Sequence, residues 1–236
     1  PARTAARSET NPTLRIFLAN VSIMNDHFDA MFSEIAAAQP QVVVLIEYNN
    51  AWHAAAESSP VLAAFPHRAK TPGFGGNTVA VFSQVPIVDQ FQDRFQMERS
   101  LGVDLEWQDR QLRLFGLHAP RPVEIGWRNY FGYWEHVSEL IDSQPRPLVV
   151  VGDFNATQYA KLYRRLTGKG LWGAHEMAGR GYATTWPNGT HWLPPIRIDH
   201  VLVSAEFCAV RAVEGMGSGS DHRPVIVDLQ WNSSVE

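Results

Sequence analysis

Runs of consecutive apolar residues recur along the chain, and each ends at a polar residue or a turn signal. Residues 148–151, Leu-Val-Val-Val, lie between Pro147 and Gly152. A strand with one face in water alternates apolar and polar side chains, so an unbroken apolar run predicts a strand buried on both faces. Residues 42–46 repeat this pattern and residues 14–19 come close to it. We therefore expect central strands at these three places.

Helical spacing separates several of the predicted strands. Apolar side chains recur at helical spacing over residues 28–35 after Asp26, the predicted N-cap, and Pro40 stops the helix. Residues 127–143 predict a longer amphipathic helix. Its inner stripe is expected to be Tyr130, Trp134, Val137 and Ile141. Further helices are predicted over 51–58 and after Thr157, the latter ending at Gly168 and Gly170.

The rest of the chain predicts strands joined by turns. Residues 101–107 and 111–117 alternate across a polar turn and predict a hairpin. The glycine-rich segment 73–77 lacks the spacing of a phosphate-binding loop and is interpreted as a turn. Further strands are expected over 78–83, 87–91, 196–203, 207–213 and 225–229. We expect a flexible lead-in over residues 1–13 and one domain over residues 14–231.

Composition excludes several classes of protein. Among the 236 residues 45% are hydrophobic and 19% are charged, which excludes a disordered chain, and no apolar run reaches the ~20 residues of a membrane span. A net charge of −4 argues against a general nucleic-acid binder, although a local basic patch remains possible. The single cysteine, Cys208, excludes an internal disulfide and a cysteine-based zinc site, and we expect it to be buried.

Polar residues of the kinds that bind metals or move protons follow many of the predicted strands. They are Asn20, Glu47, His118, Asp153, Asn155, Asp199, Asp221 and His222. Asp153 and Asn155 are two positions apart, so an extended backbone directs both the same way, where they can hold a hard cation and a phosphate. For that segment alone an ordinary turn is an equally good interpretation. Arg121 and Arg128 either face a phosphate or are simply solvated.

Taken together, these segments resemble the endonuclease/exonuclease/phosphatase superfamily, which includes DNases, apurinic endonucleases, inositol-polyphosphate 5-phosphatases and bacterial sphingomyelinases. The resemblance runs from Leu14 to Leu229. It rests on Leu18-Ala-Asn20, Val44-Leu-Ile-Glu47, Leu117-His118, Gly152-Asp-Phe-Asn155, Ile198-Asp-His-Val201 and Ser220-Asp-His-Arg-Pro224. The fold that it implies is α+β, a four-layer αββα sandwich of two mixed sheets flanked by helices, with the site at one edge.

The resemblance also implies roles for individual residues. Glu47 resembles the main Mg²⁺ ligand, with Mn²⁺ as a possible substitute, and Asn20 and Asp221 would complete or support the metal shell. His222, held by Asp199, resembles the imidazole that polarises the phosphate or takes the proton of the attacking water.

Asp153 is the competing candidate for the base. Asn155 and His118 resemble contacts to phosphate oxygens.

These roles imply a metal-dependent phosphoester hydrolase acting on a small or lipid-linked phosphoester. A nuclease of the same fold is the alternative, with a groove built from Arg121, Arg128, Arg164 and Arg165, and a non-catalytic binding module is the third. The acidic charge and the aromatic loop around Trp192 favour the first. Substrate specificity is expected to depend on loops 71–77, 119–128 and 178–195.

Three segments look most like a bacterial branch of the superfamily that often carries N-terminal membrane helices: the Gly-Asp-Phe-Asn-Ala-Thr run from Gly152, Thr185-Trp-Pro187, and the Ile-Asp-His-Val run from Ile198. That likeness implies an extracytoplasmic catalytic domain tethered to a membrane in a longer parent protein, with a cytoplasmic location as the alternative. We expect a monomer, although nothing in the sequence fixes the oligomeric state.

Overall fold

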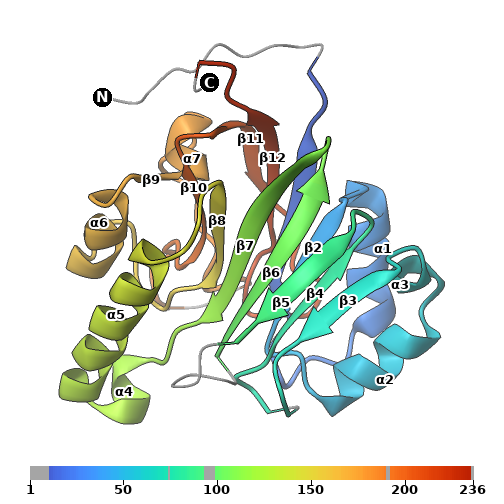
Figure 1. The fold of residues 1–236 in the computed structure, drawn as a ribbon. Helices are drawn as coiled ribbons and strands as arrows, with labels where there is room; N and C mark the ends of the chain where they lie inside the picture. Colours follow the sequence, from blue (N-terminus) through green and yellow to red (C-terminus); the bar gives the residue numbers. More distant parts are fainter. Residues whose placement is uncertain (1–10, 74, 93–98, 190–191, 235–236) are drawn as a thin grey trace.

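The computed structural model describes residues 11–73, 75–92, 99–189 and 192–234. Most of the expected lead-in over 1–13, and His191 of the aromatic loop, lie outside the described residues. Two six-stranded sheets stack face to face, with helices on the outside of each (Figure 1). The predicted four-layer sandwich of class α+β is therefore confirmed.

The first sheet has the strand order β11-β12-β1-β2-β4-β3. Its strands are β11 (Phe207–Glu214), β12 (Val225–Trp231), β1 (Leu14–Asn20), β2 (Val42–Ile46), β4 (Val79–Ser83) and β3 (His67–Lys70). The second sheet has the order β5-β6-β7-β8-β10-β9. Its strands are β5 (Ile87–Phe91), β6 (Ser100–Trp107), β7 (Arg110–His118), β8 (Leu148–Asp153), β10 (Asp199–Ser204) and β9 (Leu171–Gly173). Both sheets are mixed, because β1 pairs with β2, and β7 with β8, in parallel.

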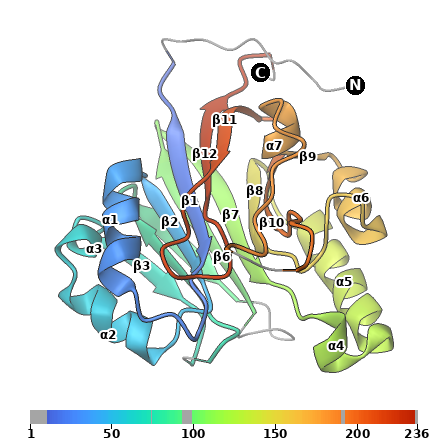
Figure 2. The same cartoon turned by 180° about the vertical axis from the view of Figure 1, so that it is seen from behind.

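Helices cover the outer face of each sheet (Figure 2). On the first sheet lie α1 (Phe28–Ala38), α2 (Asn50–Ser58) and α3 (Pro60–Ala63), and on the second α5 (Trp127–Asp142) and α6 (Lys161–Thr167). The short helices α4 (Pro122–Ile125) and α7 (Ala174–Met177) follow β7 and β9. Among the helices of the described residues, none is long and apolar enough to cross a bilayer.

The continuous apolar runs have two apolar faces to fill. In β2, Val42, Val44 and Ile46 pack between the sheets, while Val43 and Leu45 pack under the helices. β8 divides in the same way, and the inner stripe predicted for α5 is buried, as is Cys208. The alternation of side chains along a strand thus explains why these runs contain no polar residue.

Several local predictions are wrong. The residue that precedes α1 is His27 rather than Asp26, and it makes no side-chain cap. α6 begins at Lys161 without a side-chain cap, so Thr157 does not cap it. β10 begins at Asp199 rather than at residue 196, because Ile196 instead forms an isolated bridge with Trp186.

Candidate active site

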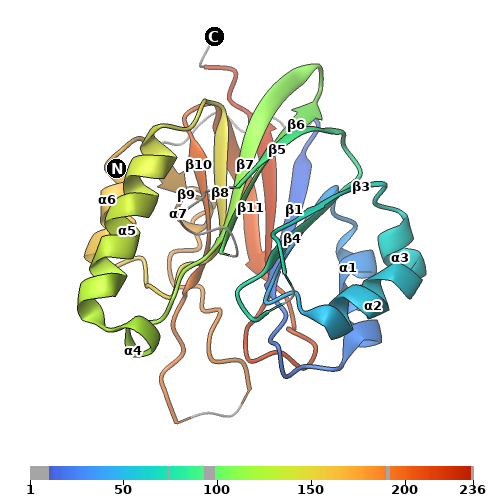
Figure 3. The same cartoon turned by 60° about the horizontal axis from the view of Figure 1, so that its bottom comes forward.

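The strand register places three of the predicted residues in one row across the second sheet. β7 and β8 pair His118 with Asp153, and β8 and β10 pair Asp153 with Asp199. Side chains that are directly opposite on neighbouring strands point to the same face of a sheet. On the first sheet, Asn20 ends β1 beside the end of β2, and Glu47 follows. The two sheets thus bring these residues together at one end of the sandwich, which faces the reader in Figure 3.

The backbone is unusual at two of these residues. Glu47 has φ 63° and Asn155 has φ 46°, in the left-handed region that residues other than glycine seldom adopt. Such conformations cost free energy and occur preferentially at functional sites. Gly152, just before Asp153, lies so close to β7 that a Cβ atom would be 1.8 Å from the carbonyl oxygen of Leu117.

Asn20 connects the two carboxylates of the site. Its Nδ2 donates to Oε1 of Glu47 at 3.0 Å and to Oδ2 of Asp153 at 3.1 Å. Its Oδ1 accepts the backbone N–H of Ser22 at 3.0 Å, which fixes the orientation of the amide. The amide of Asn20 thus positions the two carboxylates, and its oxygen has a second lone pair for the predicted role of metal ligand.

His222 is held on one side by Asp199. Its Nδ1 lies 2.9 Å from Oδ2 of Asp199, and both side chains are buried. The hydroxyl of Ser220 accepts the backbone N–H of His222 and donates to the backbone carbonyl of Asn20. This bridge joins the loop before β12 to the end of β1, so the imidazole has a fixed position relative to both sheets.

Asp153 lies between two imidazoles. Its Oδ2 is 3.8 Å from Nε2 of His222 and 4.0 Å from Nε2 of His118, while its Oδ1 accepts the backbone N–H of Asn155 at 2.8 Å. His118 Nε2 is also 3.8 Å from Oε1 of Glu47. All six segments on which the resemblance rests thus meet at one point.

Burial and neighbouring charges separate the protonation states of these groups. Burial, with Arg99 and His222 nearby, lowers the pKa of His118 to about 3, so its ring is neutral. Burial also opposes charge on His222, but Asp199 outweighs it and raises the pKa to about 10. The pKa of Asp153 is raised by burial and then by the charge of Asp199. Perturbed groups that are gathered in one cleft are typical of catalytic sites.

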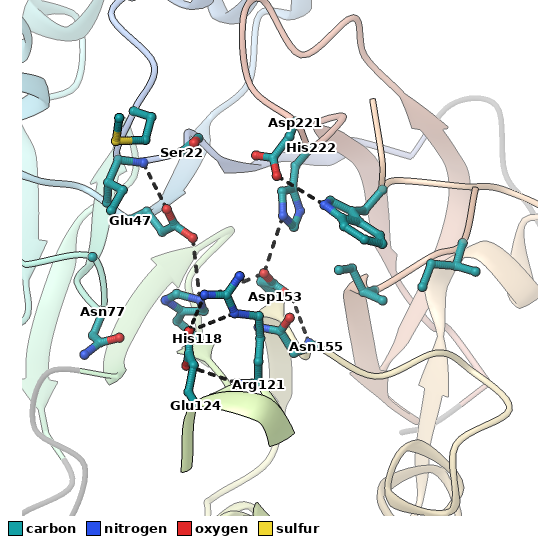
Figure 4. A pocket seen from close by; sticks show the side chains of 16 residues that line it. Ser22, Glu47, Asn77, His118, Arg121, Glu124, Asp153, Asn155, Asp221 and His222 are labelled. Carbon is teal, nitrogen blue, oxygen red and sulfur yellow. Dashed lines mark hydrogen bonds and ion pairs between the residues drawn. The ribbon is translucent and has the colours of Figure 1, made fainter. Parts of the chain in front are cut away.

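A pocket of about 460 Å³ opens above these side chains (Figure 4). Glu47, His118, Asp153, Asn155, Asp221 and His222 line it, while Asn20 and Asp199 are buried behind it. The pocket thus unites all eight predicted residues at its wall or directly beneath it. Arg121 lines this pocket, whereas Arg128 lines a neighbouring one.

The donor set fits a divalent cation. Asp153, Asp199 and His222 each place a possible ligand atom within 4.8 Å of the others. Glu47 adds a carboxylate oxygen that meets Asp153 at the amide of Asn20, and such oxygens are the ligands that Mg²⁺ prefers. Nδ1 of His222 is hydrogen-bonded to Oδ2 of Asp199, so an ion bound by these two atoms would have to displace this hydrogen bond. The side of the site near Glu47 requires no such displacement.

Other residues of the site were not predicted. The indole Nε1 of Trp186 donates to Oδ2 of Asp221 at 3.2 Å, and the buried hydroxyl of Thr185 accepts the backbone N–H of Asp199 at 3.1 Å. Glu124 lines the pocket and pairs with Arg121. Thr185 and Trp186 lie in the segment Thr185-Trp186-Pro187. A large aromatic side chain in a loop is the feature of the sequence that points to this segment.

Solved structures share this architecture. D. rerio TDP2 complexed with a single-strand DNA product is 18% identical, with a TM-score of 0.79 over 93% of this chain and 100% of that one. The 3′ phosphatase NExo from Neisseria, bound to a product DNA hairpin, is 17% identical, with a TM-score of 0.73 over 92% and 100% of the two chains. A Leptotrichia buccalis protein of the endonuclease/exonuclease/phosphatase family is 15% identical, with a TM-score of 0.73 over the same shares.

At these identities the likeness in structure establishes the fold alone. A comparison with curated proteins found no match. The model of one protein family, however, matches residues 18–222, a span that contains all eight residues of the site. The chain belongs to the endonuclease/exonuclease/phosphatase family.

Proposed function

We propose that this chain is a divalent-metal-dependent phosphoester hydrolase, with Glu47 as the main ligand of Mg²⁺ or Mn²⁺. One observation supports this most strongly: Asn20 gathers the carboxylates of Glu47 and Asp153 beside an imidazole that Asp199 holds in place. When bound, the cation would neutralise charge that develops on the phosphoryl and leaving oxygens. We keep Asp221 as a supporting ligand. Its Oδ2 accepts a hydrogen bond from the indole of Trp186, which orients the carboxylate.

The residues of the chain supply the rest of the chemistry. His222 has a raised pKa and stays cationic at neutral pH, so it donates a hydrogen bond to a phosphoryl oxygen rather than acting as the base. Asp153 accepts the proton of the attacking water as the new P–O bond forms and the ester P–O bond breaks. Asn155 directs one amide N–H to the carbonyl of Ala119 and keeps the other for a phosphate oxygen.

The rim of the pocket favours a small or lipid-linked phosphoester. Ile23 and Met24 line the pocket and are exposed, and Trp186, Ile196 and Ile198 form an apolar wall. In the loop that joins Trp186 to Ile196, Trp192 and Leu193 are exposed, as are Val123 and Trp127 on α4 and α5. Exposed aromatic and aliphatic side chains around a site are suited to an apolar leaving group or to a lipid surface.

The alternative substrate is DNA, because two of the similar structures hold DNA products. Of the four arginines proposed for a nucleic-acid groove, only Arg121 lines the pocket, and Arg165 lies near Glu135, 3.8 Å away. This distribution gives little support to a positive groove.

A substrate panel tests the proposal. Plasmid DNA, a single-stranded oligonucleotide, isoprenyl phosphate, sphingomyelin and a sugar phosphate would be incubated with Mg²⁺ and with wild-type protein or Glu47→Gln. We expect hydrolysis of a small or lipid-linked phosphate that EDTA and Glu47→Gln both abolish. Faster cleavage of DNA would favour the nuclease. Absence of both hydrolysis and divalent-ion binding would overturn the proposal in favour of a binding module.

A further inference from the structure

We propose that Arg121 binds a non-bridging oxygen of the substrate's phosphate, and that Glu124 holds this arginine aside until the phosphate displaces it. The inference rests on the proposed phosphoester hydrolase function and adds a substrate-binding residue to it. Arg121 lines the same pocket as His118 and Asp153, and its side chain is exposed at the mouth of this pocket (Figure 4).

The balance of charge in the pocket calls for such a residue. Glu47, Glu124, Asp153 and Asp221 all line it, and Arg121 is the only lysine or arginine among the described residues that do so. A phosphate that enters this pocket would therefore meet four carboxylates, the imidazolium of His222 at the floor and, at the rim, the single guanidinium of Arg121. Arginine is well suited to such contacts, because its planar fork of N–H donors matches the oxygens of a phosphate.

The present partner of Arg121 leaves donors free. Nε and Nη2 both approach Oε1 of Glu124, at 2.8 and 2.6 Å, while Nη1 has no hydrogen-bond partner among the described residues. The side chain of Arg121 is 62% exposed. The pKa of Arg121 is raised mainly by the hydrogen bond to Glu124 and to a smaller extent by the charges of Glu47 and Asp153. The guanidinium therefore already interacts electrostatically with two carboxylates of the site. Exposed ion pairs of this kind are weak, and a phosphate can compete for the arginine.

Glu124 has a second cationic partner. Nη2 of Arg99 lies 3.8 Å from Oε2 of Glu124, and Nη1 of Arg99 donates to the backbone carbonyl of His118. When Arg121 moves to a phosphate, Glu124 therefore stays beside the positive charge of Arg99. The movement does not leave the carboxylate of Glu124 without a cationic partner, which would cost free energy.

The backbone around Arg121 is fixed while its side chain is exposed. Pro120 and Pro122 flank the residue, and it has the extended conformation, φ −79° and ψ 144°, that a following proline favours. The position from which the side chain extends is thereby set before substrate arrives. Only side-chain torsions need to change for the guanidinium to turn from Glu124 to a bound phosphate.

The test compares Arg121→Gln, Arg121→Lys and Glu124→Gln with a control, Arg128→Gln, which alters an exposed arginine of the neighbouring pocket. Binding of inorganic phosphate in the presence of Mg²⁺ is measured by calorimetry, and KM and kcat are measured on the best substrate of the panel. Arg121→Gln should raise the phosphate Kd and KM by about 10- to 100-fold, and Arg121→Lys should raise them less. Glu124→Gln should lower the phosphate Kd, and Arg128→Gln should change it less than about twofold.

Two results would overturn the inference. One is a phosphate Kd for Arg121→Gln within twofold of wild type. The other is a Glu124→Gln variant that weakens phosphate binding as much as Arg121→Gln does, because the carboxylate would then position the arginine instead of competing for it. If wild type hydrolyses no phosphoester but its phosphate affinity depends on Arg121, the proposed function fails and the anion site stands.

Discussion

The Nδ1 atom of His222 lies 2.9 Å from Oδ2 of Asp199. Among the described residues, no other side chain forms a hydrogen bond or an ion pair with this buried carboxylate. A carboxylate in this position fixes the orientation of the ring and stabilises its positive charge. The variant Asp199→Asn keeps the shape and removes the charge. We expect kcat to fall by about 10²- to 10⁴-fold with a smaller change in KM, as measured by initial rates at saturating substrate.

A second histidine–carboxylate pair provides the control for this prediction. Nε2 of His175 lies 3.0 Å from Oε1 of Glu214, and neither residue lines the active-site pocket. Glu214→Gln should lower thermal stability while leaving kcat within about threefold of wild type. A loss of kcat that is equal in the two variants would show that Asp199 acts only through stability.

The raised pKa of His222 predicts how the stability of the metal-free protein depends on pH. Its folded pKa, about 10, exceeds the ~6.5 of an unfolded histidine. The stabilisation is therefore complete below pH 6.5 and is lost as the pH rises through about 10. His118 is neutral in both states over this range and does not contribute. Urea unfolding in EDTA should show the free energy of unfolding falling by more than about 1 kcal/mol between pH 7 and 10, and falling less in Asp199→Asn.

Asn20 should stabilise the site before metal binds. In Asn20→Asp a third carboxylate replaces the amide between Glu47 and Asp153, so two hydrogen bonds become repulsive contacts. We expect the variant to lose about 1–3 kcal/mol of stability in EDTA and to regain part of it with Mg²⁺. Thermal melts with and without Mg²⁺ measure both effects. Equal melting temperatures for wild type and variant in EDTA would contradict this role of Asn20.

Gly152 should be essential to the fold next to Asp153. A Cβ atom there would lie 1.8 Å from the carbonyl oxygen of Leu117, and the backbone of β7 cannot move away without breaking its parallel pairing with β8. Gly152→Ala should therefore destabilise the protein by more than about 3 kcal/mol, as measured by chemical unfolding. Gly181→Ala provides the control, because a Cβ atom at Gly181 meets nothing within 4 Å. Similar stabilities of the two variants would refute the close contact.

The central strands and the residues of the site could be predicted because both leave local marks. An apolar run buried on both faces contains no polar position, and a polar residue at its end is visible in the sequence, as at Glu47 after β2 and at Asp153, the last residue of β8. The short elements α3, β3, α4, β9 and α7 leave no such mark, because three or four residues carry too little periodicity. Helix caps were mispredicted at Asp26 and Thr157, since residue type alone does not show whether a side chain reaches a free N–H.

The roles within the site depend on contacts between segments that are distant in sequence. That Asn20 uses its nitrogen rather than its oxygen toward Glu47 is decided by the backbone N–H of Ser22. That Ser220 bridges His222 to β1 is decided by the path of the loop before β12. No spacing in the sequence encodes either contact, so the residues could be named but their partners could not.

The most direct test of the central claim is the rate of phosphoester hydrolysis as a function of Mg²⁺ concentration, measured for wild type, Glu47→Gln and His222→Gln with matched circular dichroism spectra. We expect no turnover in EDTA, a rate that saturates with Mg²⁺ in wild type, and a loss of at least about 10²-fold in each folded variant. A rate that is independent of divalent ions, or that persists in both variants, would contradict a metal-dependent hydrolase with these residues at its centre.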